Sequence, residues 1–426
     1  MNRTKRTKTL AIVAGLPLLL GLASCSSTKK ADTTAAATAD TTTAATAAET
    51  TAAAGADTTA AAAETTAAAA DTTTAAAAAE TTAAGAAGAA APAMSAADAA
   101  ARCETNKKVG KLVYLSSFDY AAAASIIDVV EADAKGYFKD LCLEVELKSS
   151  FSTANYPLVA SGKAQFSSAG SYTEIVNFSK EGAKFTAFVD YGKTPIEALI
   201  AKDPNLASVA DLKGKTIGVK GDIPPSIVAL LNKAGLKRGT DYKEVLLDGF
   251  DPKVHLAQAI DGLPVYKSNE PGQLDAAAVK YKLFDPTAEG IPGSFGLLYT
   301  SADFAAKNPT VVEDFARAAL KGMEDAVADP AGAVKNSVAK INAAGNQNFL
   351  TEAGETFRWK QELAEVVKGL GGKPIGVIVP AVFDNEIASY TAAGVIKVPD
   401  PKAYDDKIAA SVYGADGKVT FTKLTP

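Results

Sequence analysis

The chain has 426 residues, a formal net charge of −5 at pH 7, one histidine and three cysteines. At roughly 100–200 residues per domain, this length predicts more than one domain. A catalytic triad would depend on His255 alone, and a zinc site with four Cys or His ligands would need every one of those residues. We therefore expect neither a triad hydrolase nor a metal site, and no cofactor. The acidic balance argues against a nucleic-acid partner.

The N-terminus has the pattern of an export signal. Basic residues precede an apolar run from Leu10 to Leu22, which has the length of a secretory signal and is too short to span a bilayer. The run ends in Leu22-Ala23-Ser24-Cys25, which resembles a bacterial lipobox, in which the cysteine carries the lipid. We expect residues 1–24 to be a signal peptide and Cys25 to hold the protein on the extracytoplasmic face of the cell membrane through acyl chains alone. An ordinary signal with a chance cysteine is the alternative.

The next segment, residues 25–100, has a biased composition. Between Ala31 and Ala100 there are 38 alanines and 18 threonines, and no aromatic or basic residue. Such a segment cannot bury enough apolar surface to offset the entropy lost on ordering. It is predicted to be a disordered, acidic tether. A packed element is the alternative, since alanine favours helix although threonine opposes it.

From residue 101 onward, strand-like apolar runs alternate with helical stretches. The predicted strands are 111–117, 143–150, 164–170, 185–192, 197–203, 215–221, 242–249, 275–280 and 296–301, and long helices are predicted within 308–338 and 359–371. This alternation predicts an α/β fold of parallel sheets with crossover helices.

Two such series and a helical return predict two lobes that face each other across a cleft. The first part of lobe 1 is 101–193, lobe 2 is 194–293, and the second part of lobe 1, with the C-terminal helices, is 294–426. Because ligands in open α/β sheets bind beyond the carboxyl ends of the strands, the cleft between the lobes is the expected site.

Several segments of this folded part, in this order, resemble landmarks of one protein family. They read ADAKGYFKDLCLEVEL, LVASGKAQFSSAG, DLKGKTIGVKG, LDAAAV and KNPTVVEDFARAALKGMEDAVADPAGAV. The family is the substrate-binding proteins of bacterial ABC importers, in the group that handles sulfonates, taurine, nitrate and pyrimidine precursors of thiamine. The resemblance covers roughly 111–338 and implies a two-lobed type II periplasmic-binding fold. Leu141-Cys142 departs from it, because the family usually has a glycine before that strand.

The resemblance also implies a mechanism. Two lobes close on a small-molecule solute by hinge motion, and the closed form docks on a membrane permease that is powered by an ATPase. The hinge would lie at the two crossings near Asp190–Glu197 and Ser294–Thr300. No catalytic step is required, and we expect a monomer.

Cys103 and Cys142 are the two thiols that remain after lipidation. Outside the cytosol such a pair is often oxidised, and both residues come shortly before predicted neighbouring strands. We expect a disulfide between them, with two unpaired, partly buried thiols as the alternative.

Polar and aromatic residues cluster where the predicted strands end on the cleft side. The candidate ligand-binding residues are Phe118, Asp119, Tyr120, Asn155, Tyr156, Ser171, Tyr172, Tyr191, Asp222, Ser226, Asp251, Asn269 and Glu270. The aromatic rings, with those of Phe250 and Tyr266, are candidates to sandwich a flat ring of the ligand. Core packing at strand ends is the alternative, and we expect it for about half of these aromatics, since aromatic side chains dominate core energetics.

The charges of these segments bear on the ligand. They contain no arginine, which would suit sulfonate or nitrate, although amides at a helix N-terminus near Pro225 could replace it. Carboxylates are plentiful and suit a ligand with N–H donors. Asn269-Glu270-Pro271 resembles a segment of the family members that bind thiamine-pyrimidine precursors or riboflavin-related ligands, where the resemblance places it near the ligand. A nitrogen heterocycle, such as a thiamine pyrimidine precursor or related vitamin, is therefore favoured over sulfonate, taurine or nitrate.

Two alternatives come from other classes. One is an enzyme of the same fold that makes a pyrimidine, but such enzymes are intracellular and use histidine and metal. The other is a sensor or adhesin that signals to a partner other than a permease.

Overall fold

The computed structural model describes residues 94–179, 182–396 and 402–424. The predicted signal peptide (1–24), the lipidation site Cys25 and residues 26–93 of the predicted tether lie outside these residues. In the part that is described, every helix is too short or too polar to cross a membrane.

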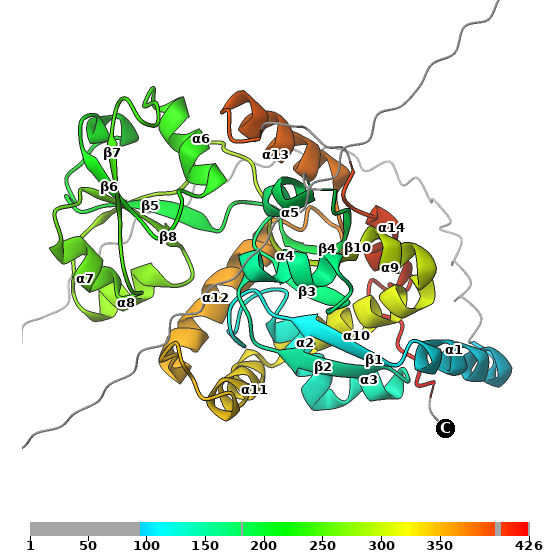
Figure 1. The fold of residues 1–426 in the computed structure, drawn as a ribbon. Coiled ribbons are helices and arrows are strands. Elements are labelled where there is room, and N and C mark those ends of the chain that lie inside the picture. The colour runs from blue at the N-terminus through cyan, green and yellow to red at the C-terminus, as the bar shows by residue number, and fades with distance from the viewer. Residues whose placement is uncertain (1–93, 180–181, 397–401, 425–426) are drawn as a thin grey trace, which may run out of the picture. The chain divides into compact units, whose positions relative to one another are not determined.

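The first of two five-stranded sheets has the strand order β2-β1-β3-β10-β4 (Figure 1). Its strands are β1 (Lys111–Leu115), β2 (Glu144–Lys148), β3 (Phe166–Ala169), β4 (Phe185–Gly192) and β10 (Phe295–Ser301). Strands β1, β2 and β3 are parallel, whereas β10 runs antiparallel to β3 and β4. The predicted α/β fold is confirmed, but the sheet is mixed, because the chain returns to it from the second sheet in the opposite direction.

The second sheet has the order β7-β6-β8-β5-β9. Its strands are β5 (Glu197–Ala201), β6 (Thr216–Val219), β7 (Lys243–Leu246), β8 (Gly262–Tyr266) and β9 (Lys282–Phe284). Strand β5 is antiparallel to both of its neighbours. The prediction of a strand at 275–280 is wrong: this segment is the end of a helix and a turn, and the neighbouring strands are 262–266 and 282–284. Its run of alanines favours helix over strand.

Helices cover both sheets (Figure 1). They are α1 (Ala96–Lys108), α2 (Ile127–Lys135), α3 (Tyr137–Asp140), α4 (Ser152–Ala160), α5 (Tyr172–Phe178), the 3₁₀ helix η2 (Val209–Leu212), α6 (Pro225–Lys233), α7 (Pro252–Ala257), α8 (Glu270–Ala276), α9 (Ala302–Lys307), α10 (Pro309–Ala328), α11 (Pro330–Ala343), α12 (Glu352–Lys368), α13 (Pro380–Ala392) and α14 (Asp406–Ser411). Several begin at a proline, which fits the first helical position because it lacks an N–H there.

Helix α10 lies against α2 in the core of the first sheet. A Cβ at Gly322 would come within 2.1 Å of the Asp128 carbonyl oxygen. Only glycine permits this close approach of the two helices, so the buried stripe of α10, which includes Val312, Phe315 and Met323, packs directly on the core.

Helix α1 begins within the range predicted to be tether. Its N-cap is Ser95, whose hydroxyl accepts a hydrogen bond from the Asp98 N–H. Cys103 forms a disulfide with Cys142, with a Cα–Cα distance of 5.2 Å. The Asn106 amide donates to the Leu141 carbonyl at 2.8 Å. The alanine-rich end of the tether is therefore helical, because residues further along α1 fix it to the first sheet.

Cys142 occupies the position where the family usually has glycine. Its φ is +59°, in the left-handed region that glycine adopts most easily. The turn keeps this conformation with a cysteine, whose side chain is held by the disulfide.

The chain passes between the two sheets twice. Residues 193–196 lead from β4 to β5, and residues 285–294 lead from β9 to β10. A Cβ at Gly293 would lie 2.7 Å from the Pro195 side chain, so the two crossings touch. The first crossing lies within the predicted hinge segment 190–197, whereas the second meets the predicted segment 294–300 only at Ser294, because the rest of that segment belongs to β10.

Candidate ligand-binding site

The end of β8 and the start of β5 bring two polar side chains together. Tyr266 is the last residue of β8 and Glu197 the first of β5, and the antiparallel register pairs them directly. Directly paired residues project from the same face of a sheet. Tyr266 is 44% exposed, and Glu197 accepts a hydrogen bond from the Ser226 hydroxyl at 3.0 Å.

A second carboxylate comes from the first-sheet part. Glu174 lies in the first turn of α5, and its Oε2 accepts a hydrogen bond from the Gly170 N–H at 2.9 Å. Desolvation raises the pKa of Glu174, and the charge of Glu197 raises it further. The two carboxylates are therefore close enough to repel each other.

Two polar groups beside this carboxylate pair are neighbours. Among the described residues, the buried Glu174 Oε1 and the Tyr156 hydroxyl make no hydrogen bond of good geometry, but the hydroxyl is close enough to Glu174 to act as its donor. The Tyr156 side chain is only 1% exposed, and the charge of Glu174 raises the pKa of its hydroxyl in addition to desolvation.

Tyr266 lies among acidic groups from several elements. Desolvation raises the pKa of its hydroxyl above the ordinary value, and four carboxylates add to the shift. These are Glu197, Glu174, Glu270 and Glu362, in order of effect. They come from β5, α5, α8 and α12, so the candidate site is acidic and is built from both sheet regions.

Helix α12 positions the loop between β8 and α8. Three consecutive loop residues meet successive turns of the helix: Lys267 lies 3.4 Å from Glu365, the Ser268 hydroxyl donates to Glu362 at 2.9 Å, and Arg358 donates to Asn269 at 2.9 Å. Glu362 also accepts from the Ala124 N–H at 2.6 Å, and its pKa is raised to about 7 by desolvation. The helix thus fixes the loop that follows Tyr266.

The basic side chains around these carboxylates are already engaged. Lys220 pairs with Glu270, Lys267 with Asp285 and Glu365, and Arg358 with Glu355. Among the described residues, no cation that contacts the site carboxylates lacks such a partner.

The helix N-termini near the site also face the protein's own acceptors. The Thr173 N–H of α5 donates to Glu386 at 2.8 Å, and the Tyr172 N–H to the Ser294 hydroxyl at 2.9 Å. At the start of α6, Ser226 faces Glu197. The anion site considered near Pro225 would therefore lie beside a carboxylate, which opposes anion binding there.

Four of the predicted aromatic residues lie in the core. Tyr120, Tyr156, Tyr172 and Tyr191 are each at most 6% exposed. The ring of Tyr156 stacks on Phe178 at 4.2 Å and that of Tyr172 on Phe383 at 4.0 Å. These rings pack in the core and present no face to a ligand. For these four residues the alternative given by the sequence, core packing at strand ends, is the one observed.

Three predicted polar residues of the first-sheet region have structural roles. Asp119 accepts a hydrogen bond from Asn348 at 3.1 Å, and Asn155 donates to the Ser116 carbonyl at 2.8 Å. Ser171 is the N-cap of α5. Asp119 and Asn155 are buried, and their side chains satisfy the hydrogen-bonding groups of Asn348 and Ser116.

Four predicted polar residues of the second-sheet region are also engaged by the protein. Asp222 pairs with Arg238 at the surface, and Asp251 is the N-cap of α7. Asn269 contacts α12, as described above. Glu270 is 1% exposed, and its two oxygens accept from Lys220 and from the Tyr266 N–H. Glu270 therefore holds the end of β8 in place, and each of its oxygens already accepts a hydrogen bond.

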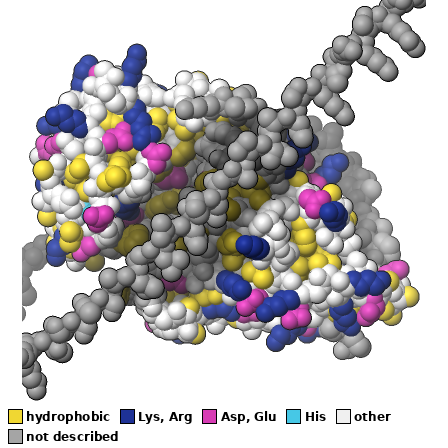
Figure 2. All heavy atoms as spheres, in the orientation of Figure 1, with side chains coloured by type: hydrophobic (Ala, Val, Ile, Leu, Met, Phe, Trp, Pro, Cys, Tyr) yellow, Lys and Arg dark blue, Asp and Glu magenta, His cyan; other side chains and the backbone are white. Residues whose placement is uncertain are grey.

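Ser226 contacts the candidate site through Glu197, and Phe118 lies near Arg358, which donates to Asn269 in the loop after Tyr266. Phe118 is half-buried, and the Arg358 guanidinium lies 5.7 Å from its ring centre. Phe250 lies elsewhere and is 63% exposed, close in sequence to Leu246 and Val254, which are also exposed. Hydrophobic side chains are visible over this region of β7 and α7 in Figure 2.

The carboxylates Glu174 and Glu197 were not among the predicted ligand-binding residues. Glu174 follows the strand-end segment 169–173 by one residue, and Glu197 ends the predicted hinge segment 190–197. A glutamate just after a strand end and another beside the first chain crossing are signals that sequence reasoning could have used.

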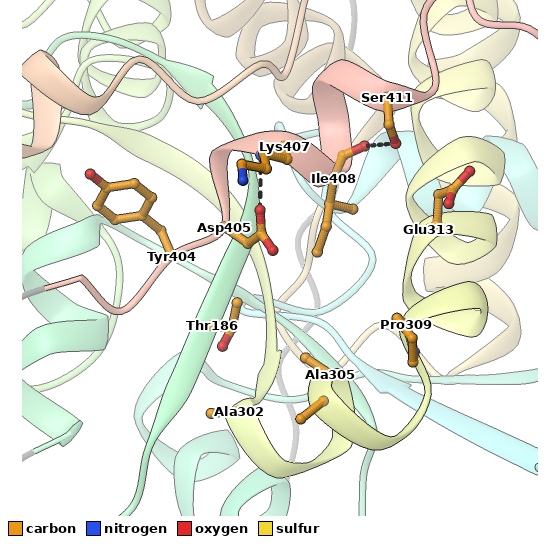
Figure 3. Close-up of a pocket in the computed structure, with 11 residues that line it drawn as sticks. Thr186, Ala302, Ala305, Pro309, Glu313, Tyr404, Asp405, Lys407, Ile408 and Ser411 are labelled. Carbon is orange, nitrogen blue, oxygen red and sulfur yellow. Dashed lines mark hydrogen bonds between the residues drawn. The ribbon is translucent and has the colours of Figure 1, made fainter.

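A hollow of about 420 Å³ lies away from this site, between α9, α10 and the segment 404–411 (Figure 3). Its lining combines alanine, proline and isoleucine with polar and charged side chains. The Asp405 carboxylate in it accepts from the Lys407 N–H, and Glu313 pairs with Arg102 and Arg317. No predicted ligand-binding residue lines it.

His255 is buried and its ring contacts the backbone. It is 1% exposed, and its Nε2 lies 2.9 Å from the Asp248 carbonyl. Within the described ranges, no group of three or more His, Cys, Asp or Glu side chains is arranged to hold a metal ion.

Comparison with known proteins identifies the relatives of this fold. The family model described as "NMT1/THI5 like" matches residues 123–333. The riboflavin-binding protein RibY of Chloroflexus aurantiacus is 31% identical over 215 residues, which are 47% of this chain and 58% of that protein. The chain thus matches less than two thirds of that relative's length.

Two solved structures share the fold. A protein of Bordetella bronchiseptica RB50 has a TM-score of 0.51 and 20% identity, covering 71% of this chain and 96% of its own. The periplasmic sulfonate-binding protein SsuA of a sulfonate ABC transporter from Methylobacillus flagellatus KT has a TM-score of 0.51 and 18% identity, covering 70% and 93%. The resemblance found in the sequence is therefore confirmed: residues 123–333 match the NMT1/THI5-like family model, and the chain shares its fold with these two structures.

Proposed function

We propose that this protein is an extracytoplasmic solute-binding receptor that delivers a flat nitrogen heterocycle to an ABC importer, with a membrane permease and its ATPase as partners. The observation that carries the proposal is the acidic setting of Tyr266, an exposed ring among carboxylates from both sheet regions. The proposed receptor acts as a monomer without a catalytic step and is anchored to the membrane by lipid on Cys25.

The chemistry of the site supports this ligand class. Glu174 and Glu197 are hydrogen-bond acceptors, and a heterocycle with N–H groups supplies the matching donors. Tyr266 and Phe118 offer aromatic surface for a flat ring. Since the neighbouring cations are paired with carboxylates, a sulfonate or nitrate would meet repulsion without a compensating bidentate partner.

Riboflavin is the first ligand to test. Its isoalloxazine ring is flat and carries an N–H donor, and the relative from Chloroflexus aurantiacus is a riboflavin-binding protein. Because the match covers 58% of that protein, the ligand of this chain is a proposal that depends on the site described here.

The fold supports closure around the ligand. The two crossings at 193–196 and 285–294 lie side by side, and adjacent connections are typical of hinges. Glu174 and Glu197 lie on opposite sides of these crossings, so a ligand held by both would favour the closed form.

A titration tests the proposal. Purified protein is titrated with riboflavin, following quenching of flavin fluorescence, and the melting temperature is measured with and without ligand. We expect saturable binding and a raised melting temperature, since a ligand at a hundred times its Kd adds about 2.7 kcal/mol of stability. Failure of riboflavin and of thiamine pyrimidine precursors, with tight taurine or nitrate binding, would overturn the proposal.

A further inference from the structure

The carboxylates of the site suggest how it chooses between related ligands. Glu197 and Tyr266 are paired across β5 and β8, and Glu174 reaches the same region from α5. No cation remains unpaired beside them within the described residues. The formal charge that a ligand meets there is negative.

We infer that this site selects its heterocycle by charge: it takes the neutral or cationic form and rejects the same heterocycle once it carries a phosphate group. The inference rests on the proposed function and specifies the substrate class of the same site. A phosphate monoester carries a charge of about −1.5 to −2 at pH 7, and placing like charges together is costly in a recognition site.

The helix N-termini support the same conclusion. Phosphate groups commonly bind where backbone N–H groups at a helix start are free. At the start of α5 the Thr173 N–H donates to Glu386, and at the start of α6 the Ser226 hydroxyl donates to Glu197. A phosphate at either helix start would therefore lie beside a carboxylate.

The position of Glu174 indicates where the selecting contact is made. Its Oε1 makes no hydrogen bond of good geometry within the described structure, and its neighbour is the hydroxyl of Tyr156, which is 1% exposed. A ligand N–H that reaches Glu174 would satisfy the acceptor, whereas a phosphate oxygen could not. Glu174 and Glu197 are therefore the specificity-determining residues.

The experiment compares riboflavin with its 5′-phosphate, which has the same ring system. Affinities are measured for the full chain and for Glu174→Gln and Glu197→Gln, with Glu104→Gln as the control. Glu104 is exposed on α1 and pairs with Lys107, so its substitution removes the same charge away from the site. Melting curves establish that each variant is folded.

We expect the wild type to bind the phosphate at least about tenfold more weakly than riboflavin. Each site substitution should lower the ratio of the Kd for the phosphate to the Kd for riboflavin, and Glu104→Gln should leave this ratio unchanged. If a site variant does not fold, the salt dependence of the wild-type ratio replaces it: the ratio should fall at high ionic strength, because salt screens the repulsion.

The outcomes separate the two proposals. Equal affinities for riboflavin and its phosphate, or a ratio that neither substitution nor salt changes, would overturn the charge selection and leave the receptor function standing. Binding of neither compound would overturn riboflavin as the ligand and the inference that depends on it.

Discussion

Tyr191 near the end of β4 is fully buried, whereas Tyr266 at the end of β8 is 44% exposed. Both were predicted from the same pattern, an aromatic residue in a polar segment after an apolar strand. In the first-sheet region, α2, α10 and α13 pack over the strand ends and enclose the rings. In the second-sheet region, the ring of Tyr266 stays open among carboxylates. The difference shows that the covering helices, which come from distant parts of the chain, decide which aromatics are available to a ligand.

The largest expected effect is the loss of a ring from the first-sheet core. Tyr191→Ala removes a buried ring and the hydroxyl that donates to Asp128 at 2.5 Å. We expect it to lower the free energy of unfolding by about 3–5 kcal/mol, since the core cannot refill the space. Tyr266→Ala serves as the comparison and should cost under about 1 kcal/mol. Denaturant unfolding measures both, and similar losses for the two would break the distinction.

The next effect is that of the disulfide, which belongs to the first-sheet region. Cys103 and Cys142 are 39 residues apart. Because the bond restricts the unfolded chain, replacing both cysteines by serine should reduce stability by about 2–4 kcal/mol. Thermal unfolding of the variant, and of wild type under reducing conditions, should show the same decrease. A melting temperature unchanged in both would mean that the disulfide contributes nothing to the stability of the fold.

Stability should also depend on pH through a carboxyl group of the first-sheet region. Asp128 is fully buried, and desolvation raises its pKa from 3.8 to about 7. Between these values the folded protein holds the proton more strongly than the unfolded chain, so stability falls as pH rises from about 4 to 7. The slope is at most about 1.4 kcal/mol per pH unit for one group.

Asp128→Asn tests this dependence. The amide can still accept from Tyr191 but does not titrate, so the slope between pH 4 and 7 should decrease. Asp303→Asn is the control and should keep the wild-type slope. Asp303 is exposed on α9, where it pairs with Lys307. Equal slopes for wild type and Asp128→Asn, measured by melting at a series of pH values, would assign the pH dependence to other groups.

Much of the fold could be predicted because its signals are local. The apolar runs of β1, β3, β4, β6 and β10 are strand-like on their own, and prolines mark several helix starts. The antiparallel returns of β5 and β10 could not be predicted, because they depend on where the chain crosses between the sheets. The strand at 275–280 was predicted wrongly because an alanine-rich run carries a weak strand signal.

The site was predicted less completely than the fold. The strand-end rule included Ser226, which contacts the proposed site residue Glu197, and Phe118. It could not show that Glu270 is less available to a ligand than Glu174. Glu270 accepts hydrogen bonds from Lys220 and from the Tyr266 N–H, and these partners are known only from the structure. Burial and pairing, which arise from contacts distant in sequence, decided which carboxylates remain available.

The central claim, that the ligand binds at Tyr266, is tested most directly by two aromatic substitutions in the second-sheet region. Tyr266→Ala and Phe250→Ala each remove an exposed ring, but only Tyr266 lies among Glu174, Glu197 and Glu362. Calorimetric titration with riboflavin should show about a tenfold loss of affinity for Tyr266→Ala, as expected for the loss of a stacking ring, and an unchanged affinity for Phe250→Ala. Riboflavin binding that Tyr266→Ala leaves unchanged would contradict the account.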